Sequence, residues 1–488
     1  MIDLTIHEEE LERSVRRARE RNIIIPTFEQ QKDPSLIPEK IRKELIGTGL
    51  WDLNPYNLFR ITWKNEPKNA GGEFGSVNAM EIPPELSGVD ARVIALVGKW
   101  FPTGAHKVGA TFGCLVPRLV TGQFDPTSQK AVWPSTGNFC RGGAYDAALL
   151  SCESIAILPE GMSRERFAWL SRVAGEVIAT PGSESNVKEI FDKCWELRKT
   201  RKDIVIFNQF EEYGNHLWHY EVTGHGLEEV LRRVMSKNDR YAGFISQTGS
   251  AGTLGAGDYL KEVFPESKIV AGEALQCPTL LMCGYGAHRI EGIGDKHVPW
   301  IHNARNTDVV IAVDDHACMH LVRLFNEPAG REYLTKQGVP EDTVADLSLL
   351  GISSIGNLLG AIKFAKYYEL TGRDIVLTVW TDSMDLYQSR LKEMEADDGP
   401  YSESEAIKDF HRYLMGESIA NMRELTYYDR KQIHNLKYFT WIEQQGKDLD
   451  ELNAQWYDFP DFWRGIHQQT AEIDRLISGF NERTGLLA

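Results

Sequence analysis

Short apolar runs alternate with helical patterns from about residue 92 to about residue 390, and this alternation constrains the fold more than any other feature of the sequence. The runs with the length and composition of buried strands are ARVIALVG, KAVWPS, SIAILP, EVIATP, DIVIFNQ, YAGFISQ, KIVAGEA, DVVIAVDD and DIVLTVWT. Helical patterns such as SNVKEIFDKCWELRKTR and IGNLLGAIKFAKYYEL separate them. Strands joined through helices form parallel sheets that are covered on both faces. We therefore predict an α/β fold whose ligands bind at the carboxyl ends of the strands.

The two ends of the chain differ from this central part. The first part holds a charged helical pattern and then a loop-rich stretch with several glycines. After about residue 390 the predicted strands stop, and the sequence becomes helical and aromatic, with YFTWIEQQ and WYDFPDFW. We predict an N-terminal extension over residues 1–90, a catalytic core over 91–390 and a helical C-terminal extension over 391–488. The C-terminal extension is expected to pack on the core, as an appended segment or as a lid, with its aromatic residues in the core or in a dimer interface.

Charge and cysteine content restrict the partners and the compartment. The chain has 488 residues with 54 basic and 70 acidic side chains, so its formal net charge is -16. A negative balance argues against non-specific binding to nucleic acid or acidic membranes and leaves room for a local basic pocket. The seven cysteines are dispersed without a C-x-x-C pair, which is typical of reduced thiols. With no apolar stretch of roughly 18 residues and no signal-peptide pattern, we expect a cytoplasmic protein without nucleic-acid or membrane partners.

Lys107 has unusual neighbours, because the stretch TGAHKVGATFG consists largely of small and apolar residues. Burial penalises the charged form of an amine and so lowers its pKa. A neutral lysine is a nucleophile that can form a Schiff base with an aldehyde cofactor. The alternative is a lysine whose stem lies on small residues while its tip reaches solvent.

Three other loops follow predicted strands or precede helices and are rich in small or hydroxylated residues. The turn GSAGT at residues 249–253 opens a helix, and its backbone N–H groups could form a phosphate cradle. Tight packing of helix against strand is the alternative for this turn. STGN at residues 135–138 and the serines of GISSI at 353–354 also precede helices. Such residues either cap the helix or hold polar groups of a ligand.

These four loops, in this order, resemble the fold-type II pyridoxal-phosphate enzymes, and most closely the cysteine synthase and cystathionine β-synthase branch of the tryptophan synthase β superfamily. Where that branch has T-S-G-N, P-E-x-M-S-x-E-R and N-Q-F with I-H-Y-E-T-T-G, this chain has STGN, PEGMSRER and NQFEEYGNHLWHYEVTG. Where the branch has G-T-G-G-T-L, H-K-I-Q-G-I-G and G-I-S-S-G, this chain has GSAGTL, HRIEGIG and GISSI. The lysine loop TGAHK is more similar to that of the tryptophan synthase β chain. The resemblance implies two parallel-sheet domains, a smaller mobile one over about 101–213 and a larger one over about 214–390.

The resemblance also implies pyridoxal 5'-phosphate as the cofactor and a role for each matching residue. Lys107 would carry the cofactor as a Schiff base and move the α-proton of the substrate. The residues that would hold the phosphate are Gly249, Ser250, Ala251, Gly252 and Thr253. His106 would add to that phosphate site. Asn138 would hydrogen-bond the 3' oxygen of the ring, and Ser353 would face the pyridine nitrogen.

The loop around STGN concerns the substrate, and here the chain departs from the branch. The residues that would bind the substrate carboxylate are Ser135, Thr136 and Gly137. The branch continues with a small Thr-Gly pair, whereas this chain continues with Phe139, Cys140 and Arg141. Arg141 would hold a second anionic group of the substrate, or it is a helix-start arginine paired with a nearby acid. We expect Cys140 to be a core residue rather than a reactive thiol.

The activity that the resemblance implies is β-elimination or β-replacement on an L-amino acid with a leaving group on Cβ, through an aminoacrylate intermediate. An acidic substrate and a homodimer are part of this hypothesis. Two alternatives stay open: a serine/threonine-type ammonia-lyase or racemase, and a cofactor-bearing subunit that depends on a partner protein. No metal site is expected, because His216 and His219 are spaced i and i+3 without a further obvious ligand in the sequence.

Overall fold

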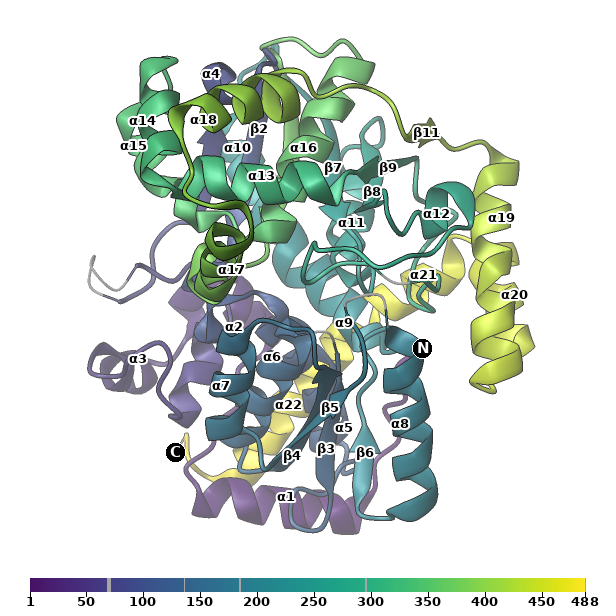
Figure 1. Ribbon diagram of the computed structural model, residues 1–488. Helices are drawn as coiled ribbons and strands as arrows, with labels where there is room; N and C mark the ends of the chain where they lie inside the picture. The colour runs from purple at the N-terminus through teal and green to yellow at the C-terminus, as the bar shows by residue number, and fades with distance from the viewer. Residues whose placement is uncertain (68–71, 136, 184–185, 295, 488) are drawn as a thin grey trace.

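Two β-sheets organise the chain, which a computed structural model describes over residues 1–67, 72–135, 137–183, 186–294 and 296–487. Within these ranges, a four-stranded sheet has the order β5-β4-β3-β6 and a seven-stranded sheet has the order β1-β2-β10-β7-β8-β9-β11. Figure 1 shows each sheet in its own lobe, the smaller one in the lower half of the view. The inner strands pair in parallel, and only the edge strands β1 and β11 pair antiparallel with their neighbours.

The strands confirm the predicted α/β fold with two parallel sheets. The small sheet consists of β3 (Lys130–Pro134), β4 (Glu153–Pro159), β5 (Glu176–Thr180) and β6 (Ile204–Ile206). The large sheet consists of β1 (Ala79–Ile82), β2 (Arg92–Val97), β7 (Arg240–Gln247), β8 (Lys268–Ala274), β9 (Val309–Val313), β10 (Asp374–Trp380) and β11 (Met422–Glu424). Strands β2 to β10 coincide with the predicted runs. The expectation that strands stop after residue 390 is wrong, because β11 adds a short edge to β9.

The small sheet is covered on both faces, as its alternating side chains require. Ala131 and Trp133 of β3 belong to the core that includes α5 (Lys107–Val120) and α6 (Asn138–Leu149). Val132 points to the opposite face and packs with α8 (Val187–Thr200). Helix α7 (Arg164–Val173) lies beside α6. Buried strands of this kind read as continuous apolar runs, which is why the sequence pattern located them.

The large sheet also has a helical layer on each face. Helices α10 (Gly224–Val234) and α11 (Gly255–Val263) share a core with Ile94 and Leu377 on one face. Helices α13 (Asp315–Asn326) and α16 (Ile352–Tyr367) pack on the other face with Val376. The first of these cores continues into the small lobe, so the two sheets share one apolar interior.

The N-terminal and C-terminal segments of the chain meet on the α/β body. Helix α22 (Gln469–Thr484) packs against α1 (Glu8–Glu20) and against α5 (Figure 1). Asn481 on α22 donates to the carbonyl of Ile25 over 2.8 Å and accepts from its N–H over 3.0 Å. Both segments therefore form part of the folded body around the helix that begins with Lys107.

Part of the aromatic residues of the C-terminal extension lies in the protein core, whereas Phe439 and Tyr457 are exposed. Trp441 and Trp463 are fully or almost fully buried and pack with Phe191 of α8.

The remaining helices in the described chain are α2 (Phe28–Lys32), α3 (Glu39–Ile46), α4 (Pro84–Ser87), α9 (Tyr213–Trp218), α12 (Thr279–Met282), α14 (Pro328–Lys336), α15 (Glu341–Asp346), α17 (Gln388–Asp398), α18 (Glu403–Asp409), α19 (Tyr427–Lys437), α20 (Leu449–Tyr457) and α21 (Asp461–His467). None of the helices in these ranges has the length and apolarity that crossing a membrane requires. All seven cysteines carry free thiols.

Candidate active site

The carboxyl ends of β3, β7 and β10 converge on one place, where the polar loops meet. Lys107 Nζ donates to Ser250 Oγ over 3.3 Å, which joins the start of α5 to the loop after β7. Asn138 Nδ2 donates to Asp382 Oδ2 over 2.6 Å, which joins the start of α6 to the loop after β10. Ligand sites of parallel sheets form at such carboxyl ends, as the sequence pattern predicted.

Lys107 is the first residue of α5 and is only 9% exposed. Burial lowers the pKa of its amine to about 8. The small residues beside it allow this burial, because a Cβ at Gly109 would lie 2.0 Å from the ring of Trp218. The prediction of a buried, poorly solvated amine is confirmed, and the solvent-reaching alternative is excluded.

Two other buried lysines show what distinguishes Lys107. Lys437 donates to the carbonyls of Trp300 and His302 and to a side-chain amide oxygen. Lys363 donates to a backbone carbonyl and pairs with Glu417. Lys107 has one hydroxyl as its hydrogen-bond acceptor among the described residues. Among these three lysines, the amine of Lys107 therefore has the most hydrogen-bonding capacity left for a ligand.

The turn at residues 249–253 buries amide donors that find no acceptor in the described protein. The backbone N–H groups of Gly249, Ser250 and Ala251 donate no hydrogen bond within these ranges, although Ser250 and Ala251 are almost fully buried. Ala251 adopts a left-handed φ of 62°. Gly252 has no room for a side chain, because a Cβ there would lie 2.1 Å from Asn215 Oδ1. Buried, unpaired N–H groups in such a turn are matched to an anion, so the residues fit the phosphate of the implied cofactor.

A buried ionic network lies beside Asn138. Arg166 pairs with Glu291 over 2.7 Å and donates to the hydroxyl of Tyr387 over 2.8 Å. Tyr387 in turn donates to Asp382 Oδ2 over 2.7 Å, the same oxygen that accepts from Asn138. Burial raises the pKa of Asp382, while Arg166 acts in the opposite direction. The network fixes the amide of Asn138 at the amino end of α6.

Arg141 lies one turn further along α6 and has no carboxylate partner in the described chain. Its guanidinium donates to the carbonyl of Thr103 over 2.8 Å and, weakly, to Asn138 Oδ1 over 3.4 Å. Its Nε atom is buried without an acceptor. The guanidinium lies over the rings of Trp51 and Trp169. Burial and the nearby Arg166 lower its pKa to about 10, so the group is charged at neutral pH. The alternative of an acid-paired structural arginine finds no support in these contacts.

The residues that were predicted to bind the substrate carboxylate are only partly described. Ser135 Oγ accepts from the N–H of Gly137 over 3.1 Å and from Gln209 Nε2 over 3.3 Å. Gly137 packs directly on Arg166, whose Cζ would lie 2.7 Å from an added Cβ. Thr136 lies outside the described residues. Ser135 and Gly137 thus stand at the amino end of α6, where an anion is stabilised by the helix dipole.

Gly292 lies close to both Ser353 and Gly249. A Cβ on Gly292 would lie 4.0 Å from Ser353 Oγ, and a Cβ on Gly249 would lie 3.2 Å from the carbonyl oxygen of Gly292. Ser353 is the second residue of α16 and is buried. The structure therefore brings Ser353 to the same region as the turn at 249–253.

His106 contacts residues other than that turn in the described chain. Its Nε2 atom is 3.2 Å from Thr381 Oγ1, and its ring packs edge-on against His219. Burial lowers its pKa well below the usual value, so the ring is neutral. In the described part of the chain, no hydrogen bond joins His106 to residues 249–253, and its role at the phosphate stays a prediction.

Cys140 is a core thiol, as predicted. It is fully buried, and its Sγ lies 2.9 Å from the carbonyl oxygen of Gly137. Burial raises its pKa to about 12, so the reactive thiolate does not form at neutral pH.

Sequence reasoning missed the residues that support the site. Asp382 and Tyr387 were not singled out, although a polar TDS sequence directly follows the predicted strand β10. Arg166, Glu291 and Asn215 lie inside the motifs that were compared, but their partners come from distant segments. The available signal was the position of Asp382 at the carboxyl end of a strand beside other site loops.

Comparison with known proteins identifies the relatives of this chain. The profile of the family described as "Pyridoxal-phosphate dependent enzyme" matches residues 101–331. A probable cysteine synthase of Bacillus subtilis is 27% identical over 319 residues, which cover 65% of this chain and 94% of that protein. A cysteine synthase of Staphylococcus aureus is 30% identical over 259 residues, covering 53% of this chain and 75% of that protein. The cystathionine beta-synthase of Saccharomyces cerevisiae is 24% identical over 328 residues and 61% of its length.

Solved structures share the fold. A hydrogen sulfide-producing enzyme of Fusobacterium nucleatum matches with a TM-score of 0.55 and 24% identity, covering 71% of this chain and 95% of the other. The O-acetylserine-dependent cystathionine beta-synthase of Helicobacter pylori matches with a TM-score of 0.53 and 24% identity, covering 64% and 94%. The two-sheet architecture described above is thus the fold-type II architecture, and the predicted resemblance is confirmed.

Proposed function

The chain belongs to the pyridoxal-phosphate-dependent enzyme family, and from this premise we propose that it catalyses β-elimination or β-replacement on an L-amino acid with a leaving group on Cβ and a second acidic group. The names of the relatives, cysteine synthases and a cystathionine beta-synthase, support chemistry at Cβ. The free capacity of Lys107 and the unpaired charge of Arg141 support the finer part of the proposal.

The cofactor site is assembled from residues of both lobes. When bound, pyridoxal phosphate supplies an electron sink for the substrate Cα. In this proposal the backbone N–H groups of residues 249–251 would bind its phosphate, because they donate no hydrogen bond within the described chain. Asn138 orients the ring through its amide, and the neutral hydroxyl of Ser353 faces the ring nitrogen. His106 adds a polar group at the phosphate end.

Lys107 is the residue that moves the proton. Its amine would hold the cofactor when no substrate is bound. With a pKa near 8, a useful fraction of the amine is neutral at physiological pH and can accept the α-proton at Nζ. The burial that lowers this pKa also excludes water that would compete for the proton.

Arg141 and the amino end of α6 divide the anionic groups of the substrate between them. Ser135, Thr136 and Gly137 bind the α-carboxylate at the positive end of the helix dipole. Arg141 binds a second carboxylate, phosphate or sulfonate, because its guanidinium is buried, charged and without an acid. A neutral side chain leaves this cation unpaired in a dry site, which disfavours neutral substrates.

The observation that carries the proposal is the contact between Lys107 and Ser250 at the carboxyl ends of the strands. The test compares O-phospho-L-serine with O-acetyl-L-serine as substrates, with and without an added thiol. Turnover of the phosphorylated substrate with a kcat/KM at least roughly 10-fold higher supports the acidic-substrate proposal. Equal turnover of both would remove Arg141 from substrate selection.

The same experiment separates the possible reaction outcomes. Pyruvate and ammonia as products indicate elimination, whereas incorporation of the thiol into a new amino acid indicates replacement. Turnover of unsubstituted L-serine or L-threonine without a better leaving group would favour the ammonia-lyase alternative.

Assembly and location complete the proposal. We propose a homodimer in the cytoplasm, and the free thiols of all seven cysteines agree with a reducing compartment. Size-exclusion chromatography with light scattering on the pure, active chain tests the assembly. A monomer that becomes active only with cell extract would favour the partner-dependent alternative.

A further inference from the structure

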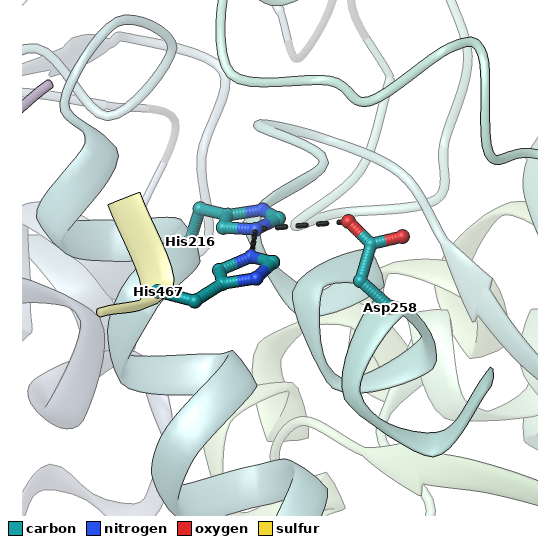
Figure 2. A group of neighbouring side chains, drawn as sticks. All are labelled: His216, Asp258 and His467. Atoms are coloured by element: carbon teal, nitrogen blue, oxygen red, sulfur yellow. Dashed lines mark hydrogen bonds and ion pairs between the residues drawn. The ribbon is translucent and has the colours of Figure 1, made fainter. Parts of the chain in front are cut away.

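Three buried side chains that are distant in sequence converge behind the turn at residues 249–253. They are His216 on α9, Asp258 on α11 and His467 at the end of α21. The Nε2 atoms of the two histidines are 3.0 Å apart, and Asp258 Oδ2 is 3.7 Å from His216 Nε2. Figure 2 shows the two rings stacked and the carboxylate aimed at them. All three ligand-type atoms lie within 4.8 Å of one another.

We propose that His216, Asp258 and His467 bind one divalent cation of the zinc class, which fastens the C-terminal extension to the catalytic core. Two imidazole nitrogens and a carboxylate oxygen form a common ligand set for zinc, with bonds of about 2.0–2.2 Å. In a tetrahedral site such ligand atoms lie about 3.3 Å apart. The observed separations of 3.0 and 3.7 Å bracket that value. The site goes beyond the reaction proposed above and does not depend on it.

The surroundings provide outer contacts for two of the three ligands, Asp258 and His467. Asn303 donates to Asp258 Oδ2 over 3.0 Å, and Asn306 donates to its Oδ1 over 2.6 Å. Glu262 Oε1 lies 3.7 Å from Nδ1 of His467, on the side away from His216. Carboxylates and amides in these places orient ligands and raise their affinity.

A cavity beside the site provides a route of entry for the cation. It has a volume of about 450 Å³ and reaches both Asp258 and His467. Its other lining residues include Asn303, Glu262 and Trp463. The cavity has room for a water molecule as the fourth ligand, since a water needs only on the order of 30 Å³.

The site connects the C-terminal extension to the cofactor-binding turn. His216 directly follows Asn215, whose Nδ2 atom donates to Ser250 Oγ over 2.9 Å. A Cβ on Gly255, at the start of α11, would lie 2.6 Å from the carbonyl oxygen of His216. Because these elements are in direct contact, a cation at the site holds the segment behind the phosphate turn in place.

The structure also allows a metal-free arrangement in which one Nε2–H donates to the other Nε2 directly. The sequence spacing pairs His216 with His219, but His219 hydrogen-bonds Thr223 over 2.9 Å instead.

A matched control exists on α13, where His316 and His320 also have Nε2 atoms 3.0 Å apart but lie at the surface. Metal bound at that pair is adventitious and is lost on His320→Asn.

The experiment measures metal content and metal-dependent stability. The wild type, His467→Asn, Asp258→Asn and His320→Asn are stripped with chelator, loaded with Zn²⁺, dialysed and analysed by mass spectrometry for metal. We expect about one equivalent of zinc per chain in the wild type and in His320→Asn, and none in the other two variants. Zinc is also expected to raise the unfolding temperature of the wild type and not that of His467→Asn.

Cobalt loading of the wild type gives a second readout that needs no variant. Co²⁺ in a tetrahedral site of two imidazoles and a carboxylate shows intense visible bands, which are measured before the cofactor is added. Wild type without these bands and without retained zinc would overturn the proposal and leave the direct histidine pair. Equal zinc in His467→Asn and wild type would overturn it as well. If His467→Asn and Asp258→Asn do not fold, the wild-type zinc content and cobalt spectrum decide. None of these readouts depends on turnover, so they stand apart from the proposed function.

Discussion

Lys107 is a cation placed where a cation is poorly stabilised. Its only hydrogen-bond acceptor among the described residues is the hydroxyl of Ser250, whereas Lys437 satisfies all three of its donors. One hydrogen bond compensates for little of the cost of removing the charged amine from water. The pKa of Lys107 therefore falls to about 8. The same small number of partners leaves N–H donors of the amine available to a ligand. The buried amine lowers the stability of the folded protein and at the same time makes the nitrogen a better nucleophile.

The lowered pKa makes stability depend on pH in a defined direction. Below pH 8 the folded protein holds a buried ammonium, and the unfolded chain holds a hydrated one. As the pH rises from about 8 to 10.5, the folded state loses its proton first, so the penalty disappears. Lys107→Met in the cofactor-free protein should therefore be more stable than wild type at pH 7, by on the order of 3 kcal/mol. In urea unfolding, that difference should shrink to about 1 kcal/mol at pH 10 and vanish above the unfolded pKa of 10.5. A difference independent of pH would show that the amine is not perturbed.

Arg141 makes a prediction about substrate binding. Arg141→Ala should raise KM for an acidic substrate roughly 10- to 100-fold, because a charge-assisted hydrogen bond is lost. The KM of a neutral substrate should change by less than about 3-fold. Steady-state kinetics with both substrates is the measurement. Arg141→Lys serves as control, since it keeps the charge without the forked geometry. Its KM for the acidic substrate should lie between the values of the wild type and of Arg141→Ala. Equal effects on both substrates would assign Arg141 a structural part.

At the scale of elements, the site depends on how closely helix and turn approach. The segment Gly252–Leu254 forms a 3₁₀ turn that runs into α11, and α9 packs directly on it. A side chain at Gly252 would meet Asn215 Oδ1 at 2.1 Å. We therefore predict that the turn keeps its backbone N–H groups in this arrangement only with a glycine at this position.

Gly252→Ala should weaken cofactor binding by roughly 10-fold or more, because overpacking costs about 1–3 kcal/mol and displaces the turn. Equilibrium dialysis of the protein against pyridoxal phosphate measures the change. Gly479→Ala on α22 is the control, since a Cβ there meets nothing within 4 Å. Unchanged cofactor affinity in Gly252→Ala would mean that this turn does not hold the phosphate.

The limits of the sequence-based predictions also appear at this scale. Strands β2 to β10 were predictable because strands buried on both faces form continuous apolar runs. Strands β1 and β11 were not, because AMEI and MRE are short edge strands without that pattern. The motif loops located Lys107 and the turn at 249–253. The pairing of Arg166 with Tyr387 was not predictable, because it joins residues 221 positions apart through tertiary packing.

At the scale of the whole molecule, the two ends of the chain are tied to each other. Arg19 donates to the carbonyl of Thr484 over 2.9 Å, and Asp474 accepts from the N–H of Phe28 over 2.7 Å. Since α22 also contacts α5, the terminal segments support the helix that presents Lys107. The terminal helices thus contribute to the stability of the site through the helix that begins with Lys107.

A substitution at Asn481 tests whether the two terminal segments stabilise each other. Asn481→Ala should lower the free energy of unfolding by about 2–4 kcal/mol, because it leaves the buried N–H and C=O of Ile25 without partners. Urea unfolding followed by circular dichroism measures the loss. Ser478→Ala, at an exposed position of the same helix, should change stability by less than about 0.5 kcal/mol. Equal stabilities of the two variants would show that the terminal segments fold independently of each other.

The most direct test of the account is to locate the cofactor covalently. The purified protein is loaded with pyridoxal phosphate, reduced with borohydride, which fixes the cofactor to the amine that carries it, and digested for peptide mass spectrometry. We predict that the modified peptide contains Lys107 and that Lys107→Ala yields no modified peptide and no visible absorption. Modification of another lysine, such as Lys363 or Lys437, or a wild type that takes up no cofactor, would contradict the account.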